Sequence, residues 1–454
     1  MRLHDDAGRN SSAPNLEQRI DSLEQELKAL KSDSGKGNAS DSKPKEPGAF
    51  GEKKKKGFEG FKLESEDKEY SLQMHLETQL DLRVYGQGNQ DPLNEVGLYM
   101  PRARMAFNGT LTKPIEYNLM FNRSVSSFDL FDAFVNFNYD PRFQFRIGRF
   151  RMPFTYEWYS IANQFLIAPE RSVFAVNYGY NRNTAAMIHG TVLDEQLDYA
   201  LSVAAGPRNS YADENNSKDI IGYVNWRPLA GCGSSTWERL NIGGSFGTGV
   251  QEQTALPINF HTSFNFSEAS VVPKMVPSFL RLNGNVTENG LRQLGEIHLA
   301  HYVGSMTLLS AIDAGFNTYG FNNKGGHVRL PTSGYHVQVG YFVTGEEVTQ
   351  RGLIAPLRPF DLRSGKMGPG AIELQTRFSH FDVGEEVFSG GLSDKSLWTN
   401  RVNAVDSGLN WYLNNYVKVY FDWQRSFYGN RVTTGSGRSA DHSDLFWLRT
   451  QIYF

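Results

Sequence analysis

The stretch that decides the fold of this chain reads Leu72-Gln73-Met74-His75-Leu76-Glu77-Thr78-Gln79-Leu80-Asp81-Leu82-Arg83-Val84. One alternate set of residues is apolar apart from a threonine, and the other set is polar or charged. Because successive side chains of a β-strand point to opposite faces, this pattern predicts a strand with one apolar and one polar face. It is longer than the five or six residues usual in soluble proteins, and an amphipathic strand of this length fits a tilted membrane crossing.

Similar segments recur along the chain between turn residues. They lie at about 96–111, 114–124, 128–140, 143–150, 183–193, 196–205, 218–227, 238–249, 291–303, 305–318, 332–344, 370–384, 401–413, 415–428 and 442–454. With the first strand they make about sixteen, and an even number puts both chain ends on one side. The sequence therefore predicts an all-β fold, a transmembrane antiparallel β-barrel of about sixteen strands.

The connections between these segments alternate between tight turns and longer loops, as in barrels with short periplasmic turns and long outer loops. One connection, 345–369, is long although it falls on the side of the tight turns. Either this connection folds into the lumen, or it contains a further pair of strands that the alternation does not reveal.

The last strand is the most specific local signal. Phe446, Leu448, Thr450, Ile452 and Phe454 would face lipid, and the polar residues between them would face inward. An amphipathic final strand with a terminal phenylalanine resembles the signal that the barrel-assembly machinery of outer membranes recognises. We therefore expect that machinery and outer-membrane lipid among the partners.

The composition excludes several other classes of protein and of binding site. The 454 residues carry a formal net charge of only −3, which gives no basis for nucleic-acid binding. No run approaches the roughly 18 apolar residues of a membrane-spanning helix. The single cysteine, Cys232, excludes a disulfide framework and a multi-cysteine metal site. We expect neither cofactor nor metal.

The N-terminal part divides into two segments ahead of a barrel domain at 70–454. In 1–31, Leu16, Ile20, Leu23, Leu27 and Leu30 follow coiled-coil spacing and predict a short helix that pairs between subunits. Residues 32–69 are rich in Lys, Gly and Ser and predict a flexible linker. Its four consecutive lysines at 53–56 could touch anionic lipid or cell-wall polymer, although a solvated linker is the simpler interpretation.

Five stretches carry a family resemblance. They are Ile147-Gly148-Arg149-Phe150-Arg151-Met152-Pro153-Phe154, Pro169-Glu170-Arg171-Ser172, Tyr341-Phe342-Val343-Thr344-Gly345-Glu346, Gly370-Ala371-Ile372-Glu373-Leu374-Gln375-Thr376-Arg377-Phe378-Ser379 and Gly408-Leu409-Asn410-Trp411-Tyr412-Leu413-Asn414. In this order they resemble the phosphate-selective porin O and P family. The resemblance implies a sixteen-stranded homotrimeric channel whose inward loops, lined by Arg and Lys, form a constriction for anions.

Alternation also predicts which basic side chains face the lumen. These are Arg83, Arg102, Arg104, Arg146, Arg377, Lys418 and Arg449. Acidic residues share the same faces, so the lumen has mixed charge. The segment 151–182 is the expected constriction loop, and within it Arg151, which matches a basic position of the family motif, and Arg171 are the first candidates for solute contacts. Each could equally pair with a carboxylate of the wall and pin the loop.

The sequence thus predicts an outer-membrane porin for passive diffusion of small hydrophilic solutes, with anions such as phosphate as candidates and the N-terminal segment in the periplasm. A structural anchor tied to the cell wall through the coiled coil is the alternative. A barrel enzyme is less favoured, because Gly243-Gly244-Ser245-Phe246-Gly247 matches a nucleophile motif without the helix that motif needs. His298 and His301 are spaced for opposite faces of a strand, which argues against a shared metal.

Overall fold

The computed structural model describes residues 61–454 apart from 87–95, 124–127, 207, 212, 214–215, 264–277, 323 and 434–437. The predicted coiled coil and the linker up to residue 60 lie outside the described residues. Among the residues that are described, no helix has the length and apolar character needed to cross a membrane.

One antiparallel sheet of seventeen strands dominates the described chain. Its first strand, β1 (Phe61–Glu64), lies in the segment expected to be linker and pairs with the start of β2. The other sixteen match the predicted segments one by one. They are β2 (Ser71–Tyr85), β3 (Val96–Thr112), β4 (Ile115–Arg123), β5 (Phe128–Asp140), β6 (Phe143–Arg151), β7 (Arg182–Val192), β8 (Leu197–Ala204), β9 (Asp219–Trp226), β10 (Leu240–Thr254), β13 (Val286–Val303), β14 (Met306–Phe321), β15 (Lys324–Phe342), β16 (Ala371–Val383), β17 (Arg401–Tyr412), β18 (Val417–Thr433) and β19 (Ser439–Tyr453).

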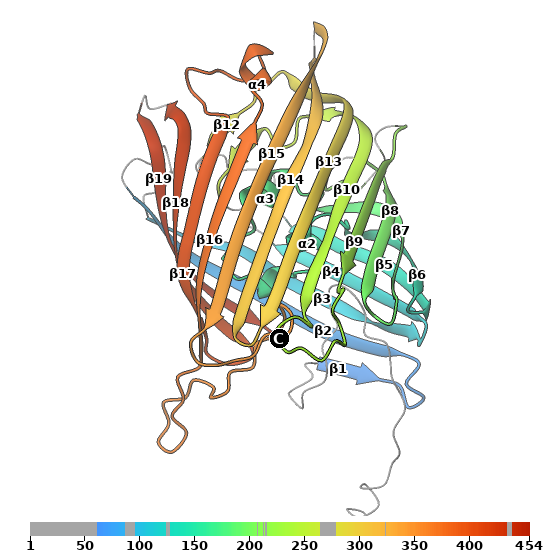
Figure 1. The fold of residues 1–454 in the computed structure, drawn as a ribbon. Coiled ribbons are helices and arrows are strands. Elements are labelled where there is room, and N and C mark those ends of the chain that lie inside the picture. Colours follow the sequence, from blue (N-terminus) through green and yellow to red (C-terminus); the bar gives the residue numbers. More distant parts are fainter. Residues whose placement is uncertain are drawn as a thin grey trace, which may run out of the picture. The chain divides into compact units, whose positions relative to one another are not determined.

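These sixteen strands form a closed barrel (Figure 1). Each pairs with its neighbours in the chain, and β19 pairs with β2 to complete the circle. Closure matters in lipid because an open sheet edge would leave backbone N–H and C=O groups without partners. The predicted fold class is confirmed.

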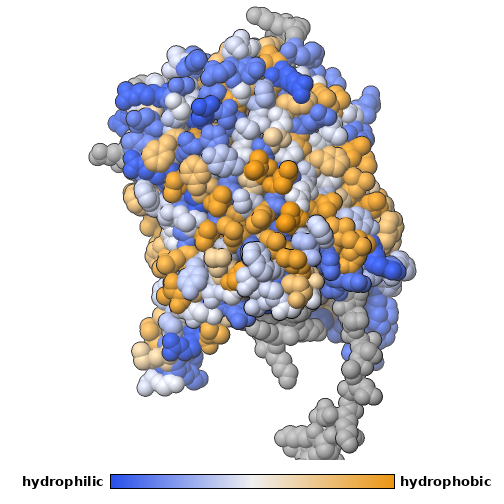
Figure 2. All heavy atoms as spheres, in the orientation of Figure 1, coloured by the Kyte–Doolittle hydropathy of each residue, from blue (hydrophilic) through white to orange (hydrophobic). Residues whose placement is uncertain are grey.

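The alternation of β2 separates its two faces as predicted. Gln79 and Asp81 are fully buried in the interior, whereas Leu80 and Val84 are 48% and 36% exposed on the outside. Figure 2 shows apolar residues spread over the middle of the outer surface, with hydrophilic residues gathered towards its upper end. This is the distribution expected of a surface that contacts hydrocarbon in its middle.

The final strand follows the same rule. Phe446 and Ile452 are exposed on the outer face, and Trp447 and Arg449 are buried inside. At the end of the chain, Phe454 exchanges two backbone hydrogen bonds with Leu76, with N···O distances of 2.9 and 3.1 Å. The last residue therefore takes part in closing the barrel.

We call the end of the barrel where β2 begins and β19 finishes the terminal rim. Turns at this rim are as short as two residues, at 113–114, 141–142 and 304–305. Two longer connections also lie here, at 227–239 and 343–370. The connection at 343–370 contains an isolated bridge between Asp361 and Gly368 and no pair of strands. The long connection noted in the sequence is therefore a loop and does not hold an additional strand pair.

The opposite rim carries longer strands and more structure than expected. β15 begins eight residues before the predicted start at 332, because its hydrogen bonding with β14 continues out to Phe321 and Lys324. The connection between β10 and β13 contains a small sheet of β11 (Asn259–His261) and β12 (Ser278–Arg281). A one-turn helix, α4 (Glu386–Ser389), lies between β16 and β17.

Candidate functional site

The loop between β6 and β7, residues 152–181, fills the interior of the barrel, and we call it the inward loop. It contains α2 (Tyr156–Tyr159), η1 (Asn163–Phe165) and α3 (Val173–Tyr178), and nearly all its residues are buried. Thr155 caps α2, with its hydroxyl accepting a hydrogen bond from the N–H of Trp158 at 3.1 Å.

Contacts with widely separated strands establish that this loop lies inside the barrel. The N–H of Thr155 donates to Ser245 of β10 at 3.0 Å, and the N–H of Tyr156 donates to Glu296 of β13 at 2.6 Å. From other parts of the wall, Arg377 of β16 donates to the carbonyl of Glu170 at 2.7 Å. The loop therefore crosses the lumen, where the sequence expected the constriction (Figure 1).

Glu170 is the main ionic anchor of the inward loop. Its two carboxylate oxygens receive the two ends of the Arg102 guanidinium at 2.6 and 2.7 Å, and Arg449 donates at 2.8 Å. Arg449 in turn pairs with Asp81 at 2.6 Å, which also holds Arg83 at 2.7 Å. Burial alone would raise the pKa of the Glu170 carboxyl, but Arg102 and Arg449 outweigh it and hold that pKa well below its usual range.

A second anchor surrounds Glu157 of α2. Arg377 approaches one of its carboxylate oxygens at 3.4 Å while pairing with Asp406 of β17 at 3.0 Å. The other carboxylate oxygen accepts a hydrogen bond from the N–H of Ser172 at 2.8 Å. Arg171 also belongs here, since it donates to the carbonyl of Glu157 at 3.1 Å and lies 4.2 Å from the Trp158 ring. Its contacts tie the loop to itself.

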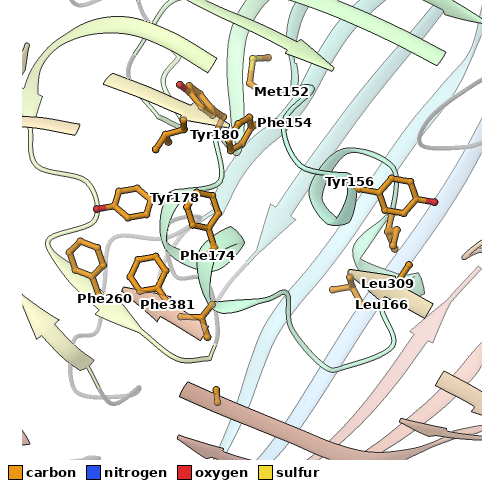
Figure 3. Packing of buried hydrophobic residues seen from close by; sticks show 14 of the residues in the cluster. Met152, Phe154, Tyr156, Leu166, Phe174, Tyr178, Tyr180, Phe260, Leu309 and Phe381 are labelled. Carbon is orange, nitrogen blue, oxygen red and sulfur yellow. The ribbon is translucent and has the colours of Figure 1, made fainter. Parts of the chain in front are cut away.

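Aromatic packing fixes the other side of the inward loop. Phe174 and Tyr178 of α3 pack against Phe381 of β16 with ring centroids 6.2 and 5.8 Å apart, and Phe260 of β11 lies 5.7 Å from Tyr178 (Figure 3). Asn177 adds two hydrogen bonds to the backbone of β11. β11, in the connection between β10 and β13, thus also packs against the inward loop, which the sequence did not predict.

The seven basic side chains expected to face the lumen all lie in the barrel wall with interior contacts. Arg146 is half-buried, and the others are almost fully buried, namely Arg83, Arg102, Arg104, Arg377, Lys418 and Arg449. Lys418 donates to the carbonyl of Leu166 in the inward loop at 2.8 Å. Arg146 lies 4.3 Å from the Phe134 ring and donates to Asn136 at 3.3 Å. Most of this set holds the loop or the wall in place.

A cavity between the inward loop and the wall brings three arginines together. Its lining comprises His75, Glu77, Arg104, Ala106, Met120, Arg151, Gln164, Arg182 and Tyr453. Arg104 is 3.2 Å from Glu77, and Arg182 is 2.9 Å from Asp132, which is not among the lining residues. Arg151 is half-buried and donates to the carbonyl of Trp158 at 3.1 Å. We call this space the arginine cavity.

The long connection at the terminal rim contributes a residue that sequence reasoning missed. Arg351 enters the interior and pairs with Glu373 of β16 at 2.6 Å. It also donates to the carbonyl of Phe165 in the inward loop at 3.1 Å and to the Tyr412 hydroxyl at 3.1 Å. Residues 343–356 therefore support the inward loop from the terminal rim.

The other chemical candidates have structural surroundings. Ser245 lies in the middle of a regular strand and accepts the hydrogen bond from Thr155, so its motif has no nucleophile elbow. His298 packs against Tyr156 of the inward loop, whereas His301 stacks on Trp237 of a rim loop. Within the described ranges, no group of three or more His, Cys, Asp or Glu residues is arranged to hold a metal ion.

Comparisons with known proteins were made with this geometry in hand. The family model described as phosphate-selective porin O and P matches residues 72–454. No curated protein matches the chain. Among solved structures, OmpF of Salmonella typhi in complex with daunomycin is similar with a TM-score of 0.52 at 10% identity, covering 86% of this chain and 100% of that one. The outer-membrane channel DcaP of Acinetobacter baumannii has a TM-score of 0.50 at 8% identity, covering 87% and 99%. At these identities the likeness shows the fold alone.

Proposed function

This chain belongs to the phosphate-selective porin O and P family, and we propose that the channel it forms prefers small anions, which it selects at the arginine cavity. As a porin, the protein is an outer-membrane channel for passive diffusion of solutes. What the family does not fix is the solute and the residues that choose it.

The composition of the arginine cavity carries this proposal. Three guanidinium groups, from Arg104, Arg151 and Arg182, line it together with one carboxylate, from Glu77. A pore selects by the charge that it presents where it is narrow, and a guanidinium donates hydrogen bonds in parallel to oxyanions. An excess of positive charge at this point favours the entry of anions.

The cavity has room for little more than water. Larger solutes therefore require the inward loop or its side chains to move aside. Arg151, the last residue of β6, is only half-buried, and it donates to the carbonyls of Trp158 and Ile161 in the inward loop, so its side chain can move together with that loop. Arg171 is buried and donates to the carbonyls of Glu157 and Ile161 in its own loop, and we assign it a structural role.

We further propose that the channel is a homotrimer without enzymatic turnover, and that the terminal rim faces the periplasm. In bacterial barrels the periplasmic turns are short, and an even number of strands puts the start of the first strand and the end of the last strand on one side. Here the short turns, the start of β2 and the end of β19 all lie at the terminal rim. The coiled coil predicted from the sequence and the lysine run would then lie in the periplasm, within reach of the cell wall. Phe454 would present the final strand to the barrel-assembly machinery.

Reversal potentials in planar bilayers under a salt gradient test the anion preference. One unit charge about 5 Å from a passing ion in water-filled space is worth about 0.8 kcal/mol, favourable for an anion and unfavourable for a cation. Arg151→Gln removes both effects and should therefore lower the anion-to-cation permeability ratio about 16-fold. Arg142→Gln is the matched control, since Arg142 is exposed in a turn at the terminal rim beside Asp140. A wild-type channel that prefers cations, or an Arg151 variant with unchanged selectivity, would contradict the proposal.

A further inference from the structure

A short hairpin projects from the terminal rim within the connection between β15 and β16. We call residues 357–369 the rim hairpin; it forms the orange loop below the barrel in Figure 1. Its base is fixed by backbone hydrogen bonds from Phe360 to the carbonyl of Leu413 at 2.7 Å and from Gly370 to the carbonyl of Arg358 at 2.9 Å. The bridge between Asp361 and Gly368 joins its two arms. The hairpin is therefore an ordered projection.

The rim hairpin rests against the lipid-facing side of the barrel. Its contact is Trp411, whose neighbours Asn410 and Tyr412 point into the interior, so that the indole itself is on the outer face of β17. The Phe360 ring packs edge-on against this indole at 4.9 Å, and the indole N–H donates to the carbonyl of Pro369 at 2.7 Å. Tryptophan at the end of a membrane strand marks the level of the lipid headgroups.

The side chains of the rim hairpin combine apolar and basic character. Leu357, Leu362 and Met367 are 68%, 74% and 72% exposed. Three basic side chains lie among them, Arg358, Arg363 and Lys366, with Asp361 as the one acidic residue, which gives a net charge of +2. Figure 2 shows the corresponding lobe below the barrel with hydrophobic and hydrophilic residues intermixed.

We propose that the rim hairpin docks on the anionic phospholipid surface of the membrane leaflet beside the terminal rim. Its apolar side chains enter the acyl-chain boundary while its basic side chains contact lipid phosphates, the arrangement by which interfacial segments bind anionic membranes. The docked hairpin is continuous with the lipid-facing surface through Trp411. This inference rests on the proposed function for the placement of the rim at a phospholipid leaflet.

Other occupants fit the hairpin less well. A cell-wall polymer would satisfy the positive charge but would leave three large apolar side chains in water. A second copy of the chain, bound through the same hairpin, would bring its net positive charge against another of the same sign. Anionic phospholipid offers phosphates to the basic side chains and acyl chains to the apolar side chains of the hairpin.

The turn at Leu193 supplies a matched comparison on the same rim. Leu193 is also a highly exposed apolar residue, but it is followed by Asp194 and Glu195. An apolar residue with acidic neighbours should be repelled from an anionic surface. The two sites thus separate a specific lipid contact from mere closeness to the membrane.

The experiment uses the full-length protein with Cys232, an exposed cysteine, replaced by serine. An environment-sensitive nitrobenzoxadiazole dye is attached at Leu362→Cys or, as control, at Leu193→Cys. Each protein is reconstituted into vesicles of phosphatidylcholine alone or with 30 mol% phosphatidylglycerol, and lipids carrying a doxyl quencher report contact with acyl chains. We expect phosphatidylglycerol to raise quenching at residue 362 at least twofold and to leave residue 193 unchanged.

The charge variant Arg358→Glu/Arg363→Glu/Lys366→Glu changes the net charge of the hairpin from +2 to −4, so phosphatidylglycerol should lower the quenching at residue 362 of this variant. Each basic side chain near an anionic surface contributes about a fivefold preference, so reversal of all three reverses the effect. Quenching that is equal in both lipids, or protection that grows with protein density and is insensitive to lipid, would overturn the proposal. Single-channel recordings of the same variants keep the two proposals apart, since conduction is expected to persist whether or not the hairpin binds lipid.

Discussion

Replacement of Glu170 by glutamine tests whether this side chain holds the inward loop in the lumen. Glu170 receives three hydrogen bonds of 2.6 to 2.8 Å from Arg102 and Arg449, and all three groups are almost fully buried. Glutamine has one acceptor oxygen and no charge, so it leaves two buried guanidiniums without their shared counterion. Breaking a buried ion pair in this way costs about 3–5 kcal/mol.

This cost destabilises the state in which the inward loop is held by Glu170, relative to the state in which the loop is detached. At about 1.4 kcal/mol for each factor of ten, it raises the population in which the loop is detached from this anchor by roughly two to three and a half powers of ten. Single-channel recording is the direct assay. We expect Glu170→Gln channels to show greater open-channel noise and a larger mean conductance, and the loop to be cut faster by added protease.

The matched control is Asp361→Asn, which breaks an exposed ion pair with Arg363 outside the lumen. Exposed pairs contribute at most about 1 kcal/mol, so this variant should conduct as the wild type does. Wild-type conductance, noise and protease resistance in Glu170→Gln would refute the reasoning, because the loop would then be held without this anchor.

The Glu170 anchor also predicts the pH range over which the inward loop stays in place. Because Arg102 and Arg449 depress the pKa of Glu170, its contribution is fully present above the ordinary glutamate pKa of 4.5 and is lost only as the pH falls through the lower folded value. Wild-type noise should accordingly be the same at pH 5 as at pH 7.

The remaining predictions concern packing and closure. Phe381→Ala empties the fully buried contact with Phe174 and Tyr178 and should destabilise the barrel by about 3–5 kcal/mol in urea unfolding, whereas Phe378→Ala, on the outer face of the same strand, should cost less than half of that. Deletion of Phe454 removes the backbone pair with Leu76 and should lower the fraction of heat-resistant folded barrel in outer membranes; normal insertion would count against this role.

The barrel could be predicted because its strands obey a local rule. In β2 and β19 the lipid requires apolar residues at alternate positions and the interior accepts polar ones, so the period of two is visible in the sequence itself. Strand ends outside the membrane lack that constraint. β15 extends beyond its predicted start because hydrogen bonding with β14 continues through residues 327–330, where apolar Val328 and Leu330 take the inner positions and polar His327 and Arg329 are exposed.

The site was predictable only in part, since faces follow from alternation and partners do not. The sequence placed Arg102 and Arg377 in the interior but could not pair Glu170 with Arg449, which lies 279 positions away. Arg351 was missed because it belongs to a loop without periodicity. Arg182 had a usable signal, as a basic residue at the junction of the constriction loop and the next strand.

An inward arginine in a barrel can attract a solute or neutralise a carboxylate, and the sequence cannot distinguish these uses. Here Arg83, Arg102 and Arg449 share Asp81 and Glu170, so the charge that suggested an anion path is largely cancelled inside the wall. These ion pairs also have a structural role, because the buried guanidiniums and carboxylates hold the inward loop across the lumen. Selectivity must then arise where cationic groups outnumber carboxylates beside open space, and the arginine cavity meets that condition. The number of inward arginines is therefore a poor measure of anion preference, and under our proposal half-buried Arg151 is the arginine whose removal should change selectivity most.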